Sequence, residues 1–175
     1  VVIAGYAFMS KKTEPTPIAE KQVIKIGLTA PLSGNLAFIG EAAKNGAELA
    51  MEEINADTKL KYKYELVVED DSFDPKKAVG AVNKLISINK VDALIGLGTP
   101  AGNAVNPVAE RNKIPYICMA SDANVAKGDY NFTHWTQPRE EVTLMLDELV
   151  KRKLKKVALI TQNQDGWLAI TTDFK

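Results

Sequence analysis

The chain has 175 residues, a length typical of one domain or slightly more. Hydrophobic residues make up 46% of it and charged residues 25%, as in soluble globular proteins. Because 22 Lys and Arg residues balance 22 Asp and Glu residues, the composition provides no basic surface for nucleic acid, and no nucleic-acid partner is expected.

The first 22 residues divide into an apolar run and a polar stretch. The run VVIAGYAFM (1–9) is too short to span a bilayer, which requires about 20 residues. The polar stretch 11–22 contains two prolines and is typical of an extended tether. We therefore predict that 1–22 is the remnant of a signal peptide or membrane anchor followed by a tether, which implies export. A buried terminal strand is the alternative.

A strand, a loop of helix breakers and a long helix are predicted next. Residues 23–29 are β-branched and apolar, the loop contains PLSGN (31–35), and residues 38–55 have a helical period with small residues on the apolar face. Gly46 lies on that face, where glycine costs about 1 kcal/mol relative to alanine. We expect close packing of this face on a sheet to compensate.

Strands and helices alternate through the central part of the chain. Strands are predicted over 64–69, 91–96 and 114–119, and helices over 75–86 and 101–112. Asp74 suits the N-cap of the first of these helices and Pro75 its first position. The alternation predicts right-handed βαβ units and a parallel sheet. Ligands of such sheets bind beyond the carboxyl ends of the strands, which here lead into the loops 30–37, 70–74, 97–101 and 120–124.

A second α/β unit is predicted after the Gln-Pro pair at 137–138. Residues 139–153 have an amphipathic helical pattern, 155–161 (KKVALIT) are typical of a buried strand, and a helix is expected from 168. A strand and helix with no strand after them cannot close a sheet. We therefore expect the chain to be a fragment of a longer protein.

The glycine-rich loop GLGTPA (96–101) follows a predicted strand and fits the pattern of a dinucleotide-binding turn. Its position after the third strand, the proline at Pro100 and the lack of a well-spaced acidic residue weaken that interpretation. The same loop suits a carboxylate, because glycines let the backbone approach a ligand, Thr99 offers a hydroxyl and the next helix presents N–H donors.

Other candidate groups favour structural roles. The acidic residues EDD (69–71) with Asp74 match no calcium-loop spacing and are typical of a solvated strand end with a helix cap. His134 is the only histidine, and the single cysteine, Cys118, lies in an apolar strand pattern typical of a buried residue. No catalytic residue, metal site or cofactor is predicted.

Three ordered blocks of the sequence resemble a known family. They are IKIGLTAPLSGNLAFIGEAAKNGAELAMEEIN, VVEDDSFDPKKAVGAVNKLI and VDALIGLGTPAGNAVNPVAERNKIPYI. They resemble the branched-chain amino-acid-binding proteins of ABC importers, which are type I periplasmic binding proteins. The resemblance implies an α/β fold with two Rossmann-like lobes and a ligand between them. On this basis 23–137 is most of the first lobe, with 131–138 as the first crossing, and 138–175 is only the start of the second lobe.

The resemblance also implies a set of ligand-binding residues. Thr99 occupies the position of the hydroxyl residue that binds the ligand carboxylate, and Ala120 that of the carbonyl that accepts the ammonium. Asp122 stands where the family often has Thr; an aspartate pairs with an ammonium but repels a nearby carboxylate. Ile39 stands where an aromatic residue is common. The full predicted set is Ser33, Phe38, Ile39, Gly98, Thr99, Ala120, Ser121, Asp122, Asp165 and Trp167.

The function implied is that of an extracytoplasmic receptor, periplasmic or at the cell surface, that delivers an amino acid or similar small polar ligand to an ABC permease. A sensory domain on the same fold is the main alternative, since such lobes also serve regulators. A nucleotide-dependent α/β enzyme that uses the loop GLGTPA is a further alternative.

Overall fold

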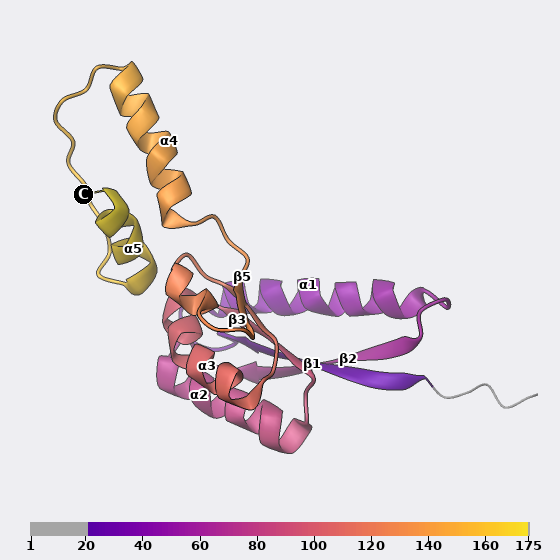
Figure 1. Cartoon of the computed structure of the whole chain (residues 1–175). Coiled ribbons are helices and arrows are strands. Elements are labelled where there is room, and N and C mark those ends of the chain that lie inside the picture. The colour runs from indigo at the N-terminus through magenta and orange to yellow at the C-terminus, as the bar shows by residue number, and fades with distance from the viewer. Residues whose placement is uncertain (1–20, 175) are drawn as a thin grey trace, which may run out of the picture.

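The computed structural model describes residues 21–174 and contains a five-stranded, wholly parallel sheet in the order β2-β1-β3-β4-β5 (Figure 1). The strands are β1 (Gln22–Ala30), β2 (Tyr62–Asp70), β3 (Ala93–Leu97), β4 (Tyr116–Met119) and β5 (Asn131–Thr133). The predicted parallel α/β architecture is confirmed. The strand β5 lies within the predicted crossing segment and pairs with β4 at the edge of the sheet.

Helices follow four of the strands and continue beyond the sheet. They are α1 (Ala37–Ala56), α2 (Pro75–Lys84), α3 (Thr99–Asn112), α4 (Pro138–Lys151) and α5 (Asp165–Phe174), with a π-helical turn at Leu85–Asn89 and a 3-10 turn at Ala123–Ala126. We call residues 22–133 the sheet unit and residues 138–174 the C-terminal segment. None of the described helices is long and apolar enough to cross a membrane. The apolar run 1–9 and most of the predicted tether lie outside the described residues.

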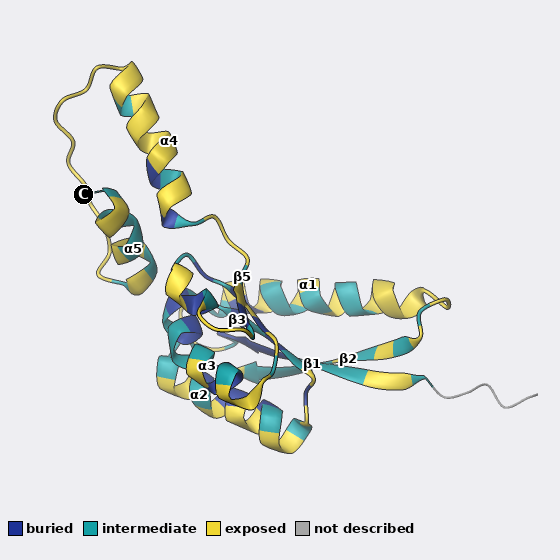
Figure 2. Cartoon of the chain, viewed as in Figure 1, coloured by how far each residue is buried: buried dark blue, intermediate teal, exposed yellow. Residues whose placement is uncertain are grey.

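The hydrophobic core lies between the sheet and the helices α2 and α3 (Figure 2). Side chains of the predicted apolar stripe of α2 enter it, and Leu85 and Val82 are completely buried. The sheet supplies Leu94 and Tyr116, and α3 supplies Val105. Burial of a side chain such as leucine contributes about 1.5–3 kcal/mol, so this layer accounts for much of the stability of the sheet unit.

The start of α2 confirms the predicted cap. The Asp74 carboxylate accepts hydrogen bonds from the backbone N–H groups of Lys76 and Lys77, both at 2.9 Å. Pro75 occupies the first turn, where no intrahelical N–H donor is required. The cap fixes the point at which the chain leaves the 70–74 loop and thus the course of that loop along the sheet edge.

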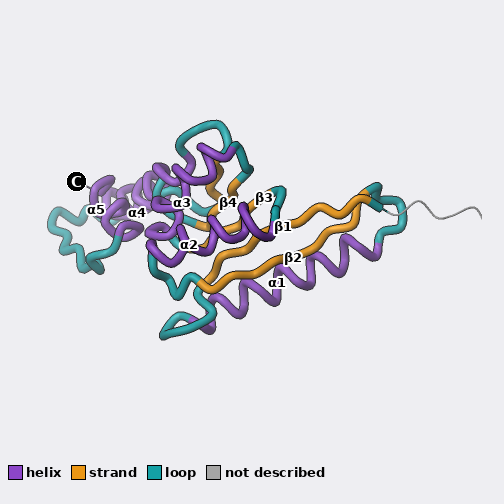
Figure 3. Tube along the Cα trace, turned by 90° about the horizontal axis from the view of Figure 1, so that it is seen from below, coloured by secondary structure: helices purple, strands orange, loops and turns teal. Residues whose placement is uncertain are grey.

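The helix α1 covers the opposite face of β1 and β2 from α2 and α3 (Figure 3). The prediction of close packing at Gly46 is wrong, because a Cβ built there meets no atom within 4 Å. Gly40 is the glycine that allows a close approach: its missing side chain lets the backbone of Pro31 lie directly against the helix. Periodicity placed Gly46 on the apolar face of the helix but could not show that Gly40 is the glycine in contact with another segment.

The C-terminal segment consists of α4 and α5, which pack on each other, joined by an irregular connection (Figure 1). The predicted strand 155–161 is wrong: these residues form no strand and all are exposed. A strand requires a partner for its backbone N–H and C=O groups, and no described strand lies beside this stretch. The helix α5 begins at Asp165, three residues before the predicted start at 168.

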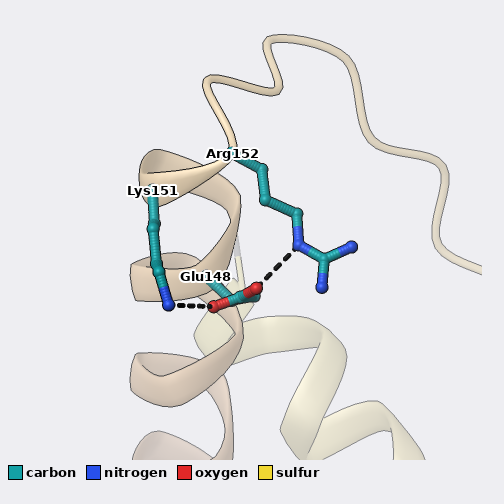
Figure 4. A network of polar contacts seen from close by, with 3 residues as sticks. All are labelled: Glu148, Lys151 and Arg152. Atoms are coloured by element: carbon teal, nitrogen blue, oxygen red, sulfur yellow. Dashed lines mark hydrogen bonds and ion pairs between the residues drawn. The ribbon is translucent and has the colours of Figure 1, made fainter.

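The polar contacts on α4 lie at the protein surface. Glu148 contacts both Arg152 and Lys151 (Figure 4). The N–O distances are 2.6 Å to Arg152 and 3.8 Å to Lys151. All three side chains are largely exposed, and such i,i+3 and i,i+4 pairs stabilise a helix by only about 0.2–0.5 kcal/mol each.

Candidate functional site

A cavity of about 460 Å³ lies where β3 and β4 end, between the sheet unit and the C-terminal segment. The volume lies within the range of about 300–1,000 Å³ usual for small-molecule sites. Most of its walls are apolar. The lining residues are Pro31, Leu36, Ile39, Phe73, Leu97, Gly98, Thr99, Met119, Ala120, Ser121, Trp135, Glu141, Gln164, Gly166, Trp167 and Ile170.

The amino terminus of α3 forms one polar part of the wall. Thr99 is the first residue of the helix and is almost fully buried. Its Oγ1 accepts a hydrogen bond from the backbone N–H of Ser121 at 3.1 Å, which leaves the hydroxyl proton free to be donated. Together with the first-turn N–H groups, this hydroxyl suits a carboxylate or another small anion.

Gly98 gives the loop before α3 its shape. Its φ of 91° lies in the region that favours glycine. The ring of Phe73 occupies the space that a side chain at this position would need. Phe73 itself has a φ of 58°, and its N–H donates to the Asp71 carboxylate at 2.8 Å. The 70–74 loop is thus fixed so that Phe73 packs over Gly98 and lines the cavity.

The end of β4 supplies Ala120 and Ser121. The carbonyl of Ala120 accepts a hydrogen bond from Thr133 Oγ1 at 2.6 Å. A carbonyl oxygen has two lone pairs, so one acceptor site remains for a ligand. Thr133 of β5 therefore holds the Ala120 carbonyl in place, and the family resemblance implies that this carbonyl accepts the ligand ammonium.

Asp122 faces away from this cavity. Its carboxylate accepts hydrogen bonds from the backbone N–H of Asn124 at 2.8 Å and from Asn103 Nδ2 at 3.1 Å. It caps the 3-10 turn that follows and lines a separate shallow depression with Asp165. Because Asp122 does not line the cavity, the expected repulsion of a ligand carboxylate by Asp122 does not arise there.

The C-terminal segment closes the cavity from the other side. A Cβ at Gly166 would lie 3.1 Å from Thr99 Oγ1, so the missing side chain lets the amino terminus of α5 approach that of α3. Trp167 and Gln164 line the wall beside it. The cavity is thus shared between two parts of the chain that are far apart in the sequence.

The structure brings six of the ten predicted site residues to the cavity wall. These are Ile39, Gly98, Thr99, Ala120, Ser121 and Trp167. The other four, Ser33, Phe38, Asp122 and Asp165, do not line it. Phe38 is 70% exposed, and Ser33 contacts Ser72 at 2.7 Å; PLSGN (31–35) contributes Pro31 to the wall rather than its serine.

Sequence reasoning missed three functional candidates on the cavity wall, namely Phe73, Trp135 and Glu141. Phe73 belongs to a loop that was placed at the correct edge of the sheet, and its aromatic side chain was the available signal. Trp135 lies in the predicted crossing. Glu141 is in the first turn of α4, where an acidic residue is ordinary, so nothing in the sequence distinguished it.

Asp70 anchors the PLSGN loop to the end of β2. Its carboxylate accepts hydrogen bonds from the backbone N–H groups of Leu32 and Ser72, both at 2.8 Å. Desolvation raises the pKa of Asp70, but the hydrogen bonds from Ser33, Ser72 and Leu32 outweigh it and lower the pKa to about 2. The Asp70 carboxylate therefore holds the PLSGN loop in place. Among the described residues no group of acids, histidines or cysteines is arranged to hold a metal ion.

Asp71 differs from its neighbour in being completely buried, which corrects the prediction of a solvated strand end. Burial raises its pKa, and the charges of Asp70 and Asp74 add to that effect, although the hydrogen bond from Phe73 opposes it. Cys118 is buried as predicted, and burial raises the pKa of its thiol to about 11. It is therefore protonated at neutral pH and is no nucleophile.

Comparisons with known proteins agree with this architecture. A sequence model of the family described as periplasmic binding protein matches residues 23–175. The Leu/Ile/Val-binding protein homolog 8 of Brucella abortus is 35% identical over 60% of this chain, and the match spans 26% of that relative.

Two solved structures are similar in fold. One is the branched-chain amino acid transporter substrate binding protein LivJ from Streptococcus pneumoniae in complex with isoleucine, with a TM-score of 0.79 and 30% identity over 87% of this chain and 46% of that chain. The other is a solute binding protein of an ABC transporter from Rhodopseudomonas palustris in complex with 3,4-dihydroxybenzoic acid, with a TM-score of 0.77 and 26% identity over 87% and 42%. The chain therefore spans less than half the length of either.

Proposed function

The chain belongs to the periplasmic binding protein family, and from that membership we propose that it is the ligand-binding part of an extracytoplasmic receptor for an ABC importer. The receptor holds a small polar ligand of the amino-acid type and presents it to a membrane permease. The relatives with solved structures are named as transporter solute-binding proteins, which supports this role over an enzymatic one.

The observation that carries the proposal is the cavity shared by the sheet unit and the C-terminal segment. Its polar groups come from the amino terminus of α3 and from the end of β4, at the edge where parallel sheets bind their ligands. Gly166 lies close to Thr99 across the cavity. A ligand bound here touches both parts and stabilises their contact, as a hinged receptor requires.

The division of the chain follows from this proposal. Residues 23–137 form most of the first lobe and 138–175 begin the second. Residues 1–22 supply the signal or anchor remnant and tether, and the receptor is periplasmic or held at the cell surface.

Thermal unfolding with a panel of amino acids, small dicarboxylates, NAD and ATP tests the function. A ligand present at 100 times its dissociation constant stabilises the protein by about 2.7 kcal/mol, which raises the melting temperature by several degrees. We expect stabilisation by amino acids. Stabilisation by NAD or ATP alone would overturn the receptor function and favour an enzyme that uses the loop GLGTPA.

A set of variants links the binding to the cavity. Thr99→Val should weaken binding at least tenfold because it removes the proposed carboxylate donor, whereas Thr99→Ser keeps the hydroxyl and the affinity. Thr143→Val, on the exposed face of α4, is the matched control and should bind normally. Equal binding by the Thr99→Val and Thr143→Val variants would exclude this cavity as the site.

A further inference from the structure

Asp71 is the only completely buried acidic side chain among residues 21–174. Its Oδ1 accepts a hydrogen bond from the backbone N–H of Phe73 at 2.8 Å, whereas its Oδ2 has no hydrogen-bond partner. No lysine, arginine or histidine of the described chain forms an ion pair with it. A buried carboxylate without a cation opposes folding, which points to a role for Asp71 other than stability.

The side chains of the sheet near Asp71 are uncharged. They are Thr29 of β1 and Tyr116 and Cys118 of β4. Burial, with the nearby charge of Asp71 as a smaller cause, raises the pKa of both Tyr116 and Cys118, so both are neutral at pH 7. The Tyr116 hydroxyl lies over Gly96, which pairs with Thr29, and neither hydroxyl has a hydrogen-bond partner among residues 21–174. The sheet therefore provides no positive charge that would keep Asp71 ionised.

The 70–74 loop adds negative charge to these surroundings. Burial raises the pKa of Asp71 above its ordinary value of 3.8, and the charges of Asp70 and Asp74 raise it further, although one backbone hydrogen bond opposes them. The Lys77 ammonium of α2 reaches this loop, but it contacts Ser72 Oγ at 3.1 Å and makes no ion pair with Asp71. Asp71 therefore takes up a proton at a higher pH than Asp70, whose pKa is about 2.

The hydrogen bond to Asp71 Oδ1 keeps Phe73 at the cavity wall. Ser72 and Phe73 have φ angles of 48° and 58°, in a region that is unfavourable for residues other than glycine. The hydrogen bond from the Phe73 N–H to Asp71 spans this strained turn. The Phe73 ring then lies over Gly98 and lines the cavity. The position of the ring thus depends on how strongly the Asp71 carboxylate accepts.

Protonation of Asp71 weakens this hydrogen bond. An ionised carboxylate accepts a hydrogen bond about twice as strong as that to a neutral acceptor. Because Oδ2 has no partner, it can take up a proton from solvent without the loss of an existing hydrogen bond. Oδ1 then belongs to a neutral carboxylic acid and holds the Phe73 N–H less strongly, which favours relaxation of the strained turn.

We propose that Asp71 is a positioning residue of the cavity: while it is ionised it holds Phe73 over Gly98, and uptake of a proton releases Phe73 and weakens ligand binding. The effect on affinity rests on the receptor function proposed above, whereas the effect on Phe73 is a property of the ligand-free protein. By linkage, affinity falls as the pH drops through the pKa of Asp71 in the folded protein, which lies above 3.8.

NMR of the ligand-free protein tests the link between Asp71 and Phe73. The side-chain carboxyl carbon of Asp71 reports its titration, and the hydrogen-exchange protection factor of the Phe73 amide reports the turn. We expect the Phe73 amide to lose protection with the same midpoint at which Asp71 takes up its proton. Titration of Asp71 without a change at the Phe73 amide, or with a midpoint at or below pH 3.8, would overturn the proposal.

Titration calorimetry with L-isoleucine between neutral and acidic pH tests the effect on binding. The Asp71→Asn variant should bind about fivefold more weakly than the parent protein at pH 7, as expected for the weakening of one charge-assisted hydrogen bond. It should also lose the fall in affinity with acid that the parent shows. Its melting temperature at pH 7 should not decrease, because the variant no longer buries a charge. A residue with a merely structural role would lose stability and affinity together.

The Asp74→Asn variant is the matched control on the same loop. Asparagine caps a helix as well as aspartate does, so binding at pH 7 should be that of the parent protein. The fall in affinity should remain but move to lower pH, because the Asp74 charge contributes to the raised pKa of Asp71. Glu141 is the charged residue on the cavity wall, so an unchanged fall in affinity in Asp71→Asn would assign it elsewhere and overturn the proposal.

The failure of this inference is distinguishable from failure of the receptor function. If L-isoleucine and the other amino acids do not bind and only NAD or ATP stabilises the protein, the receptor function fails, and the Phe73 amide still decides whether Asp71 controls the turn. If L-isoleucine binds with the same affinity and pH dependence in the parent protein and in Asp71→Asn, the receptor function stands and the inference fails.

Discussion

The sheet unit and the C-terminal segment contain similar apolar patterns but differ in what covers them. In the sheet unit, Leu85 and Leu94 are buried between the sheet and two helices. In the C-terminal segment, Leu144 is 71% exposed and Val150 76% exposed, and α5 has no buried residue. The hydrophobic effect stabilises a fold only where apolar surface is removed from water. The stability of the described chain is therefore concentrated in the sheet unit.

Two apolar stretches of similar composition show how this difference arises. VDALIG (91–96) becomes most of β3, which pairs with β1 on one side and β4 on the other. KKVALIT (155–161) remains irregular and exposed. A single strand with no neighbour leaves its backbone groups without partners, so an apolar sequence alone does not form a strand.

Truncation of a leucine in each region is the strongest way to test the comparison. Leu85→Ala should destabilise the protein by about 3 kcal/mol, since a fully buried leucine is lost and a cavity remains. Leu144→Ala should change the free energy of unfolding by less than about 0.5 kcal/mol, because its side chain is mostly in water. Urea denaturation of both variants measures the difference, and equal losses would mean that α4 is covered in solution.

Two glycines in the long helix α1 make the same comparison on a smaller scale. Gly40→Ala should destabilise by about 1–3 kcal/mol because the new side chain meets the backbone of Pro31. Gly46→Ala should stabilise by about 0.5–1 kcal/mol, since its position is open and alanine favours helix. Melting temperatures of the two variants should therefore shift in opposite directions, and a loss at Gly46 would indicate a partner surface there.

Removal of one polar contact from each region should give the smallest difference in stability of the three comparisons, but a measurable one. Asp70→Asn should cost about 1 kcal/mol at neutral pH, because charge-assisted hydrogen bonds to the PLSGN loop weaken. Glu148→Gln should cost less than about 0.5 kcal/mol, and that cost should shrink in salt.

The pH dependence of the free energy of unfolding shows whether the Asp70 charge is responsible for this cost. Because the pKa of Asp70 falls from 3.8 in the unfolded chain to about 2 in the folded protein, the folded state binds fewer protons between these values. Its stabilisation is therefore fully present above about pH 4 and is lost as the pH falls through about 2. Unfolding curves of the parent protein and Asp70→Asn should converge in acid. A difference that persists below pH 2 would show that the mutation acts through packing instead.

Local sequence determined the elements of the sheet unit because each signal there acts over a few residues. Asp74 and Pro75 start α2 through contacts within one helical turn, and the alternation of apolar strands and helices suffices for a parallel sheet. The sequence alone therefore predicts that the loops at its carboxyl edge, which contain Thr99 and Ser121, meet at one site.

Only the tertiary structure decided which side chains reach the cavity and which apolar stretches become buried. The Asp122 carboxylate is hydrogen-bonded to Asn103 and Asn124 outside the cavity, whereas Glu141, on the helix α4, lines the cavity. Such outcomes depend on contacts between segments far apart in sequence, and periodicity reports only the neighbours along one helix or strand. The same limit explains why 155–161 was predicted as a strand: the apolar pattern is present, but no described strand lies beside it to pair with it.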